Sequence, residues 1–325
     1  LGTTTTQLVF SRLTVRNEGS AFSVPNYTVA AREVLRRSAV HFTPLRSERE
    51  LDAEAIARIV DAEYAAAGID RRAVQTGAVI ITGETARREN ARAVLEALSG
   101  YAGDFVVATA GPALESALAG RGAGAADYSQ AHACTVVNLD IGGGTADIAV
   151  LSLNGIVQKE SIKLGGDKFD QAVVRYLRER YGLLIGEKMA ELVKREIGTV
   201  AREPGTDSFE VKGRNLTTGL PEKRRISAAE LRPCLLEIAQ QIVGTMQSVL
   251  ERTPPELVGD IFTSGAVMTG GGSLLRGLDE LIEEKLHIKA QVAESAEECV
   301  AIGTGCCFDF IDELSEDVIR YGSNR

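Results

Sequence analysis

The chain alternates between short apolar runs and segments in which apolar side chains return every three or four residues. The first pattern is typical of buried strands and the second of amphipathic helices. Strands are expected within 1–15, 27–45, 76–83, 103–112, 136–153, 208–231, 264–269 and 289–294. Helices are expected within 52–69, 84–102, 112–125, 167–182, 186–198, 228–257, 274–286 and 299–314. This alternation, with hairpins among the crossovers, predicts an α/β fold with mixed sheets.

Three consecutive glycines interrupt the apolar run VVNLDIGGGTADIAVLSL (136–153). Glycine in a strand costs conformational entropy and packs nothing, so the triplet indicates a tight turn or a close backbone approach. The stretch 1–11, LGTTTTQLVFS, has the same pattern, since placing Leu1 over Ile141 aligns a Gly and a Thr of each copy. The repeat predicts two similar α/β halves that each open with a Gly/Thr-rich hairpin.

Both hairpins have the chemistry of a phosphate site. Glycines let backbone N–H groups converge on a concavity that suits phosphate oxygens, and threonine hydroxyls add donors. Asp140, directly before the second turn, would repel phosphate but suits a Mg²⁺ that bridges phosphates, bound directly or through water. Its counterpart in the first copy is expected among residues missing before Leu1. The expected phosphate contacts are Gly2, Thr3, Thr4, Thr5, Gly142, Gly143, Gly144 and Thr145.

A third glycine cluster, MTGGGSLL, covers 268–275 and lies between an expected strand and an expected helix. Such a turn allows close backbone approach to a nucleotide and presents a helix N-terminus. The three clusters together predict a nucleotide-binding site. A P-loop is excluded because the GxxxxGK[ST] pattern is absent, and a Rossmann site is disfavoured because no GxGxxG follows the first strand.

Composition narrows the class of protein. The 325 residues are 44% apolar and carry a net charge of −9, which suits a two-lobed fold and argues against general nucleic-acid binding. No apolar run reaches the roughly 18 residues of a spanning helix. Five cysteines without CxxC spacing indicate reduced thiols, and three scattered histidines form no metal cluster. A cytoplasmic location is expected, with membrane association as a further option.

Paired Asp-x-Gly-x-x-Thr-type hairpins and a late GGG turn resemble the actin, Hsp70 and sugar-kinase superfamily. Residues 1 to about 145, with LGTTTTQLVFSRL and GAVIITGETARRENARAVLEAL, resemble EutA, the reactivating factor of ethanolamine ammonia-lyase. Residues from about 146 to 325, with KLGGDKFDQAVVRYLRERYGLLIGE and MTGGGSLLRGLDELI, resemble the bacterial actin MreB. The two resemblances predict a mosaic with a first lobe over 1–135 and a second over 136–325. Natural recombination, engineering and misassembly of the sequence all stay open as its origin.

The resemblance implies a bilobed actin-like ATPase fold, with two ribonuclease-H-like lobes and mixed sheets around a cleft for ATP and Mg²⁺. Asp140 would organise the Mg²⁺ and the attacking water. Lys194 and Glu196 would contact ribose or adenine, although an exposed helix face explains them equally well. The residues that would flank the adenosine are Gly270, Gly271, Gly272 and Ser273.

Two further groups of acids have open interpretations. Bacterial actins carry a water-orienting Glu where this chain has Gly111, and Glu115, one helical turn on, is a candidate substitute. Slow hydrolysis, with Glu115 as a structural or partner-facing acid, is the alternative. Asp167 and Asp170 are a carboxylate pair, but their position at a helix start favours roles as capping and first-turn acids.

Two functions follow from the two resemblances. The MreB-like part implies a weak ATPase that forms filaments or dimers and organises cell-wall synthesis near the inner membrane. The EutA-like part implies an ATP-dependent chaperone that reactivates cobalamin-dependent ethanolamine ammonia-lyase. A chain that binds ATP but performs neither role is a third possibility.

Overall fold

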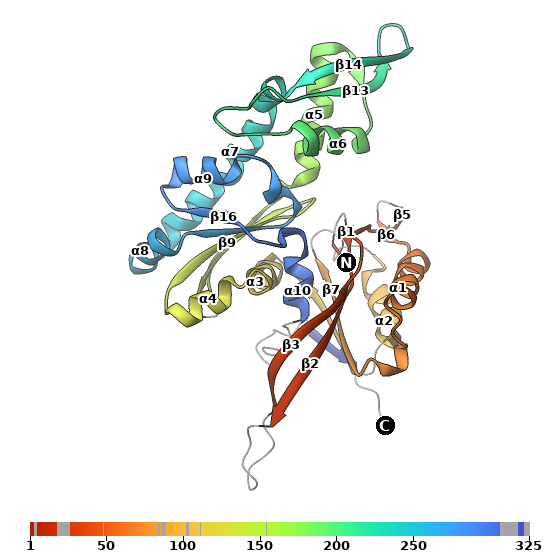
Figure 1. Ribbon diagram of the computed structural model, residues 1–325, viewed down its shortest axis with the longest axis vertical. Helices are drawn as coiled ribbons and strands as arrows, with labels where there is room; N and C mark the ends of the chain where they lie inside the picture. The colour runs from red at the N-terminus through yellow and green to blue at the C-terminus, as the bar shows by residue number, and fades with distance from the viewer. Residues whose placement is uncertain are drawn as a thin grey trace. The chain divides into compact units, whose positions relative to one another are not determined.

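The computed structural model describes residues 1–2, 5–17, 27–47, 49–82, 85, 89–101, 104–110, 112–153, 155–305 and 318–321. These residues form two compact units, drawn in Figure 1. Unit 1 combines Leu1–Gly122 with Val300–Arg325, and unit 2 is the continuous stretch Ala123–Cys299. These boundaries come from the contacts within each unit. The division into lobes over 1–135 and 136–325 stays a prediction.

Unit 2 is built on a five-stranded mixed sheet, with the order β11-β10-β9-β15-β16. β9, β10 and β11 form an antiparallel meander, whereas β15 runs parallel to both β9 and β16. The bounds are β9 Thr135–Ile141, β10 Ala146–Ser152, β11 Gly155–Ile162, β15 Ala266–Thr269 and β16 Ala290–Val292. Every residue of β9 and of β15 is buried, as expected for apolar runs at the centre of a sheet.

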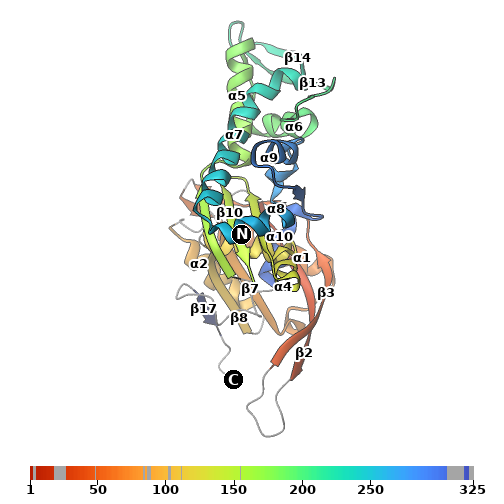
Figure 2. The ribbon, with the colours of Figure 1, turned by 90° about the vertical axis from the view of Figure 1, so that its left-hand side faces the viewer.

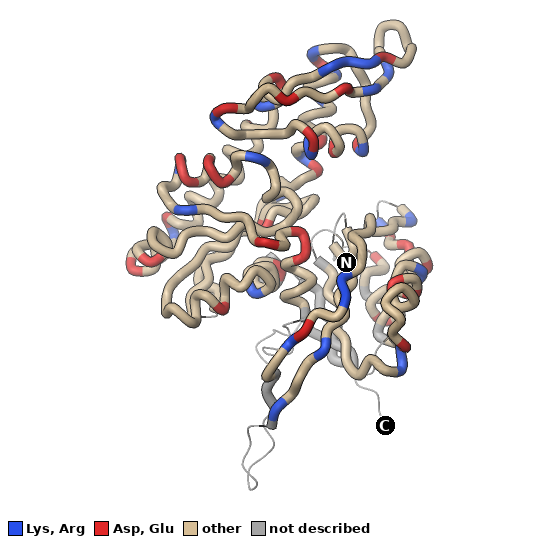
Figure 3. The backbone as a smooth tube through the Cα atoms, viewed as in Figure 1, with Lys and Arg blue, Asp and Glu red and all other residues tan. Residues whose placement is uncertain are grey.

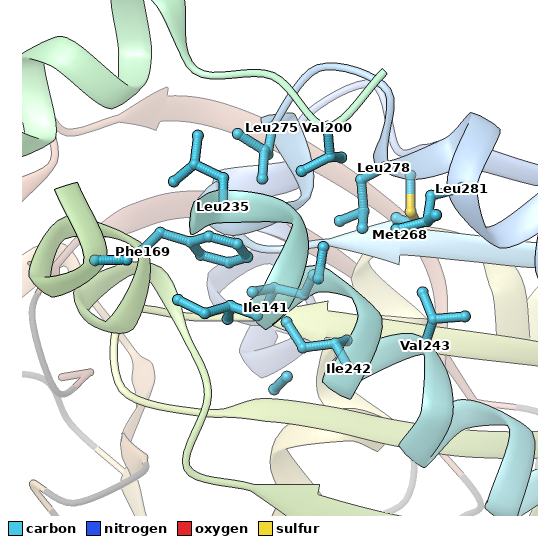
Figure 4. Packing of buried hydrophobic residues seen from close by; sticks show 14 of the residues in the cluster. Ile141, Phe169, Val200, Leu235, Ile242, Val243, Met268, Leu275, Leu278 and Leu281 are labelled. Carbon is cyan, nitrogen blue, oxygen red and sulfur yellow. The ribbon is translucent and has the colours of Figure 1, made fainter. Parts of the chain in front are cut away.

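Helices cover this sheet and close its core. They are α4 Ala125–His132, α5 Gly166–Tyr181, α6 Glu187–Ile197, α7 Ala228–Arg252, α8 Pro255–Ser264 and α9 Leu278–Leu286. Figure 4 shows the main cluster, in which Phe169 of α5 and Ile141 of β9 lie among side chains from α7, β15 and α9. The cluster fixes the start of α5 beside the end of β9.

A second, smaller sheet extends unit 2 (Figure 2). Its strands are β12 Leu183–Leu184, β13 Ser208–Asn215 and β14 Pro221–Ser227, all paired antiparallel. Ser227 ends β14 and caps α7, since its side chain accepts from the Glu230 N–H while the Glu230 carboxylate accepts from the Ser227 N–H. This reciprocal capping box sets the point where strand becomes helix.

Unit 1 contains a three-stranded sheet in which β7 (Thr76–Thr82) and β8 (Asp104–Ala110) run parallel, and β17 (Val318–Tyr321) joins β8 antiparallel. Its helices are α1 Ala53–Ala67, α2 Ala91–Leu98, α3 Pro112–Gly122 and α10 Cys299–Gly305, the last of which begins at the final residue of unit 2. Unit 1 also contains three two-stranded pairs. Two are short, β1 Thr5–Thr6 with β4 His41–Phe42 and β5 Leu45–Ser47 with β6 Glu50–Leu51. The third is a long ribbon of β2 Val9–Asn17 and β3 Tyr27–Arg37.

The mixed α/β prediction is confirmed, with local differences. α1 begins after Asp52, which caps the Ala55 N–H, and ends at a left-handed Gly68, as its sequence predicts. The helix expected over 84–102 is described only from Ala91 to Leu98. The described α-helices and strands that the sequence did not predict are α4, α8, β6, β11, β12 and β17. The end of the last expected helix, with Cys306 and Cys307, lies outside the described residues.

Figure 3 marks the positions of Lys, Arg, Asp and Glu along the backbone. The basic run Lys223–Arg225 lies within strand β14. Lys223 pairs with Glu210 across the hairpin, and the Arg224 guanidinium lies over the ring of Tyr181. In the described part of the chain, no helix combines the length and the apolar character needed to cross a membrane.

Candidate functional site

The turn between β9 and β10 has the expected hairpin geometry. The Gly142 N–H donates to the Thr145 carbonyl at 2.9 Å, which closes the turn. The Thr145 hydroxyl donates to Asp147 Oδ2, also at 2.9 Å, and Asp147 lies opposite Asp140 in the strand register. Residues 142–145 are partly exposed, whereas the strands on either side are buried. The turn is therefore an accessible loop on a rigid base.

Asp140 is buried, with 3% of its surface exposed. Its Oδ1 accepts a hydrogen bond from the Thr269 hydroxyl at 3.0 Å. Burial raises the pKa of Asp140 to about 7, the charge of Asp147 adds to the increase, and the Thr269 hydrogen bond opposes it. Two neighbouring buried carboxylates form a site that gains from a cation.

The late glycine turn packs directly on this acid, because β15 pairs in parallel with β9 and places Thr269 beside Asp140. Gly270 has φ +79° and ψ 158°, a conformation that is essentially restricted to glycine. A Cβ on Gly270 would overlap the Ile141 carbonyl and lie 2.7 Å from Asp140 Oδ1. The second and third glycine clusters of the sequence therefore meet around Asp140.

The geometry after this turn differs from the expected helix N-terminus. Residues Gly271–Leu274 form a short 3-10 helix, and α9 begins only at Leu278. Ser273 is buried, and its hydroxyl donates to the Gly270 carbonyl at 2.7 Å, which shapes the turn. What this segment offers a ligand is close backbone approach, the first of the two features predicted for it.

Lys194 and Glu196 lie in the last turns of α6 and have different surroundings. Lys194 Nζ pairs with Asp170 Oδ1 at 2.9 Å and donates to the Gly166 carbonyl at 3.1 Å. Glu196 is exposed, and its backbone carbonyl accepts from Arg276. The sequence did not predict the contact between Asp170 and Lys194, because it favoured a role for Asp170 as a capping or first-turn acid.

The start of α5 is a part of the site that the sequence did not predict. The Gly166 N–H donates to the Gly142 carbonyl at 2.9 Å, and the Asp167 N–H donates to the Gly143 carbonyl at 2.8 Å. The N-cap is Gly165, which has no side chain to cap the helix. A Cβ on Gly165 would lie 2.5 Å from the Gly143 carbonyl oxygen, which explains why the residue before the helix is glycine.

Unit 1 carries the remaining predicted residues. The Gly2 N–H donates to the Thr5 carbonyl at 2.8 Å, the same bond that joins Gly142 to Thr145 in the second copy of the repeat. Glu115 is buried in the first turn of α3. Thr3, Thr4 and Gly111 lie outside the described residues. The repeated turn supports the internal repeat that was predicted from sequence.

Metal binding by protein groups alone receives no support from the described residues, which contain no cluster of three or more His, Cys, Asp or Glu able to hold an ion. Mg²⁺ usually keeps several waters and binds through one or two carboxylates together with substrate phosphates. Asp140 with Asp147 beside it fits that ligand set. The donors present therefore suit a Mg²⁺ that arrives with a polyphosphate.

The mixed sheet, the acid before a glycine turn and the second glycine turn packed on that acid agree with the actin-like ATPase fold that the sequence predicts. Family models agree: the model described as "Ethanolamine utilisation protein EutA" matches residues 1–203, and that described as "Cell division protein FtsA" matches residues 137–305. The chain belongs to the actin-like ATPase superfamily, to the EutA family through 1–203 and to the FtsA family through 137–305. Both matches include the Asp140 hairpin and Lys194.

Individual relatives match a smaller part of the chain. The cell shape-determining protein Mbl of Bacillus cereus (strain ATCC 10987 / NRS 248) is 45% identical over 182 residues, 56% of this chain and 55% of Mbl. The cell shape-determining protein MreB of Escherichia coli (strain K12) is 44% identical over 180 residues, 55% of this chain and 52% of MreB. The chain thus spans about half the length of the curated relatives it matches.

Solved structures confirm the fold. MreB5 of Spiroplasma citri bound to AMPPNP aligns with a TM-score of 0.68 and 29% identity, over 84% of this chain and 80% of that one. A structure described as the MamK double helical filament aligns with a TM-score of 0.62 and 18% identity, over 85% and 81% of the two chains. The MamK likeness shows the fold alone. The predicted superfamily and fold class are therefore correct.

Proposed function

We propose that this chain is an ATP–Mg²⁺-binding nucleotide switch of the actin fold. The observation that carries the proposal is the convergence of the 142–145 turn and the 270–273 turn on the buried Asp140. Backbone N–H groups of the first turn would bind phosphate, and Gly270 to Ser273 would lie along the adenosine. Gly2, Thr3, Thr4 and Thr5 stay the phosphate contacts that the sequence predicts for the first copy of the turn. The MreB5 structure bound to AMPPNP supports a nucleotide as the ligand.

In this proposal, Mg²⁺ would be held by the nucleotide phosphates, by water and by Asp140. When bound, it would neutralise phosphate charge and polarise the terminal phosphoryl group. Asp140 would orient the hydrated ion, and Thr269 would fix one carboxylate oxygen through its hydroxyl. Glu115 stays the candidate for positioning the attacking water. Its replacement by Gln is expected to slow hydrolysis more than it weakens binding.

Nucleotide binding is tested by calorimetric titration of the parent and Asp140→Asn with ATP and Mg²⁺. We expect Asp140→Asn to bind at least about 10-fold more weakly, because one charge-assisted contact is worth about 1.5–3 kcal/mol. Asp127→Asn is the matched control, since Asp127 is exposed on α4. Equal affinity of Asp140→Asn and the parent would show that the site lies elsewhere.

For the biological role, we propose an ATP-dependent filament former of the MreB type that acts in cell shape, in the cytoplasm or at the inner membrane, with cell-wall machinery as partner. The 44–46% identity to Mbl and MreB proteins supports this role. Sedimentation and electron microscopy with ATP and Mg²⁺ test it. Pelleted polymer that depends on nucleotide is expected. If the ATP-bound protein stays in the supernatant at high concentration, that result excludes filament formation.

A second role is favoured by the extent of the EutA match, which covers residues 1–203 and therefore the first segment of unit 1 and the Asp140 hairpin. In this role the chain is an ATP-dependent chaperone that releases damaged cobalamin from ethanolamine ammonia-lyase. The test adds the chain and ATP to cobalamin-inhibited lyase and measures turnover. Recovery of turnover that requires ATP supports the role, and the absence of recovery excludes it.

A further inference from the structure

Arg276 lies shortly after the 270–273 turn and reaches the C-terminal end of α6. Its Nε donates to the Gly198 carbonyl at 3.2 Å, and its Nη2 donates to the Glu196 carbonyl at 3.3 Å. The last four carbonyls of an α-helix have no partner within the helix, and a cation at that end also balances the helix dipole. Arg276 therefore caps α6 from a distant part of the chain.

Backbone contacts join the same two segments. The Val200 N–H donates to the Arg276 carbonyl at 2.8 Å, and the Thr199 hydroxyl donates to that carbonyl at 3.2 Å. Gly277 has φ +80°, and a Cβ there would lie 2.3 Å from backbone atoms of Ala201. The two segments thus approach as closely as a residue without a side chain allows, and they have one defined separation.

Buried side chains complete this contact. Figure 4 shows Val200 beside Leu275, with Leu278 next to them, and all three belong to the main core cluster of unit 2. Val200 is 2% exposed and Leu278 is fully buried. The contact between the end of α6 and the segment after the 270–273 turn is therefore part of the core, and Arg276 closes its outer edge.

Both segments border the Asp140 hairpin. The 270–273 turn packs on Asp140 itself, as described above. The last turn of α6 reaches the hairpin through Lys194, whose ammonium donates to the Gly166 carbonyl at 3.1 Å. The Gly166 N–H in turn donates to a carbonyl of the turn after β9. Arg276 therefore connects two parts of the chain that each belong to the surroundings of the proposed nucleotide site.

The 142–145 turn, by contrast, is held by other bonds. It is closed by the bond from the Gly142 N–H to the Thr145 carbonyl, and it is tied to the start of α5. The side-chain contacts that the structure describes for Arg276 go to the end of α6 and to Asp207. The Asp207 pair is exposed, with 46% of Arg276 and 55% of Asp207 accessible, so solvent screens it strongly. The end of α6 is therefore the part of the molecule that Arg276 sets.

We propose that Arg276 is a positioning residue that holds the C-terminal end of α6 against the segment after the 270–273 turn, and that it thereby sets the nucleoside side of the site and not the phosphate side. This inference rests on the proposed nucleotide site and deepens it. The 270–273 turn is the part of that site that would lie along the adenosine, and Arg276 fixes the helix end next to its continuation. The ligand class that depends on Arg276 is a nucleotide, as opposed to a free polyphosphate.

The test compares two ligands, ATP–Mg²⁺ and inorganic tripolyphosphate–Mg²⁺, by calorimetric titration of the full chain. Arg276→Met removes the charge and all the donors of the side chain. We expect it to bind ATP about 5- to 10-fold more weakly and tripolyphosphate as the parent does, because only ATP contacts the part of the site that Arg276 positions. Arg202→Met changes an exposed arginine in the loop between α6 and β13, and as the matched control it should leave both affinities unchanged.

Three further measurements separate positioning from a general loss of structure. Asp207→Asn removes only the exposed ion pair, so it should weaken ATP less than about 2-fold. Arg276→Lys keeps the charge at the helix end but loses the planar fork of donors, so it should recover only part of the ATP affinity. In the ligand-free protein, the Gly198 amide, which donates to the Lys194 carbonyl at the end of α6, should exchange hydrogen faster in Arg276→Met than in the parent.

Four outcomes overturn the inference. Equal losses for both ligands in Arg276→Met show that Arg276 acts on the phosphate side or on the stability of the whole unit. Unchanged ATP affinity in that variant shows that the site does not depend on the end of α6. A loss in Asp207→Asn as large as that in Arg276→Met assigns the effect to the ion pair. Unchanged exchange of the Gly198 amide shows that Arg276 does not hold the helix end.

Failure of the proposed function gives a different result. A parent chain that binds neither ATP nor tripolyphosphate overturns the nucleotide site itself. A parent chain that binds ATP, together with any of the four outcomes above, leaves the site in place and removes only the role of Arg276.

Discussion

Replacing Gly270 with alanine tests whether the late glycine turn has to lie against Asp140. The new methyl group would overlap the Ile141 carbonyl and lie 2.7 Å from Asp140 Oδ1. The backbone conformation of Gly270 costs an alanine about 1–3 kcal/mol, and an added methyl in a packed site costs about 1–3 kcal/mol. We expect a total loss of about 2–6 kcal/mol in the free energy of unfolding. That is a large part of the roughly 5–15 kcal/mol available to a domain.

Gly205→Ala separates the two contributions. Gly205 has nearly the same positive φ, +75°, but a Cβ there would meet nothing within 4 Å. The free energy of unfolding of Gly205→Ala should therefore fall only by the cost of the left-handed backbone, about 1–2 kcal/mol. Urea unfolding followed by circular dichroism measures the midpoints of the parent and both variants. Titration with ATP and Mg²⁺ then shows whether Gly270→Ala also loses its ligand.

The comparison can refute the reasoning directly. If Gly270→Ala unfolds at the same urea concentration as Gly205→Ala, the turn does not press on Ile141 and Asp140 as described. If Gly270→Ala is destabilised but binds ATP as the parent does, the turn supports the fold and has no part in the site.

Three further changes test the packing, the capping and the helix propensity of unit 2. Phe169→Ala removes a fully buried ring from the core and should cost about 3–5 kcal/mol in urea unfolding; a loss below about 1 kcal/mol would contradict its place in the core. Hydrogen bonds from Tyr181 and Ser227 hold the pKa of Glu230 below its usual value, so its contribution to stability is present above pH 4.5 and is lost as pH falls through the lowered pKa. Glu230→Gln should therefore lose up to about 1 kcal/mol at pH 7 and show a shallower fall in melting temperature at acid pH, whereas parallel curves would exclude the effect. Gly244→Ala, at an exposed position of α7 where a Cβ meets nothing, should raise the free energy of unfolding by about 0.5–1 kcal/mol, and a decrease would argue against the helix there.

The sequence predicted those parts of the site whose chemistry is local. A glycine triplet after an apolar run predicts a turn whatever the run packs against. The position of Asp140 directly before that turn can also be read from the sequence. The repeat also predicted a turn at the start of the chain like the one after Asp140, and the Gly2–Thr5 bond agrees with it. The superfamily followed from these motifs together.

Contacts between elements could not be predicted in this way. Thr269 reaches Asp140 because β15 and β9 pair in one particular register, which periodicity does not contain. Lys194 and Asp170 lie on helices whose faces are set by packing in the core, so their ion pair has no local signal. The short helix α8 was missed because the sequence indicates one long helix within 228–257, and the Pro254-Pro255 pair in that range separates α7 from a second helix.

The connectivity of the two units has a consequence for how the protein is made. Unit 2 is one uninterrupted stretch, whereas unit 1 needs strand β17, which pairs with β8 from the far end of the chain. During synthesis, unit 2 can finish folding while the outer edge of β8 is still without its neighbour. The outer edge of β8 therefore stays open until the segment that follows unit 2 has been made and has emerged, and an open strand edge is where a folding intermediate can pair wrongly.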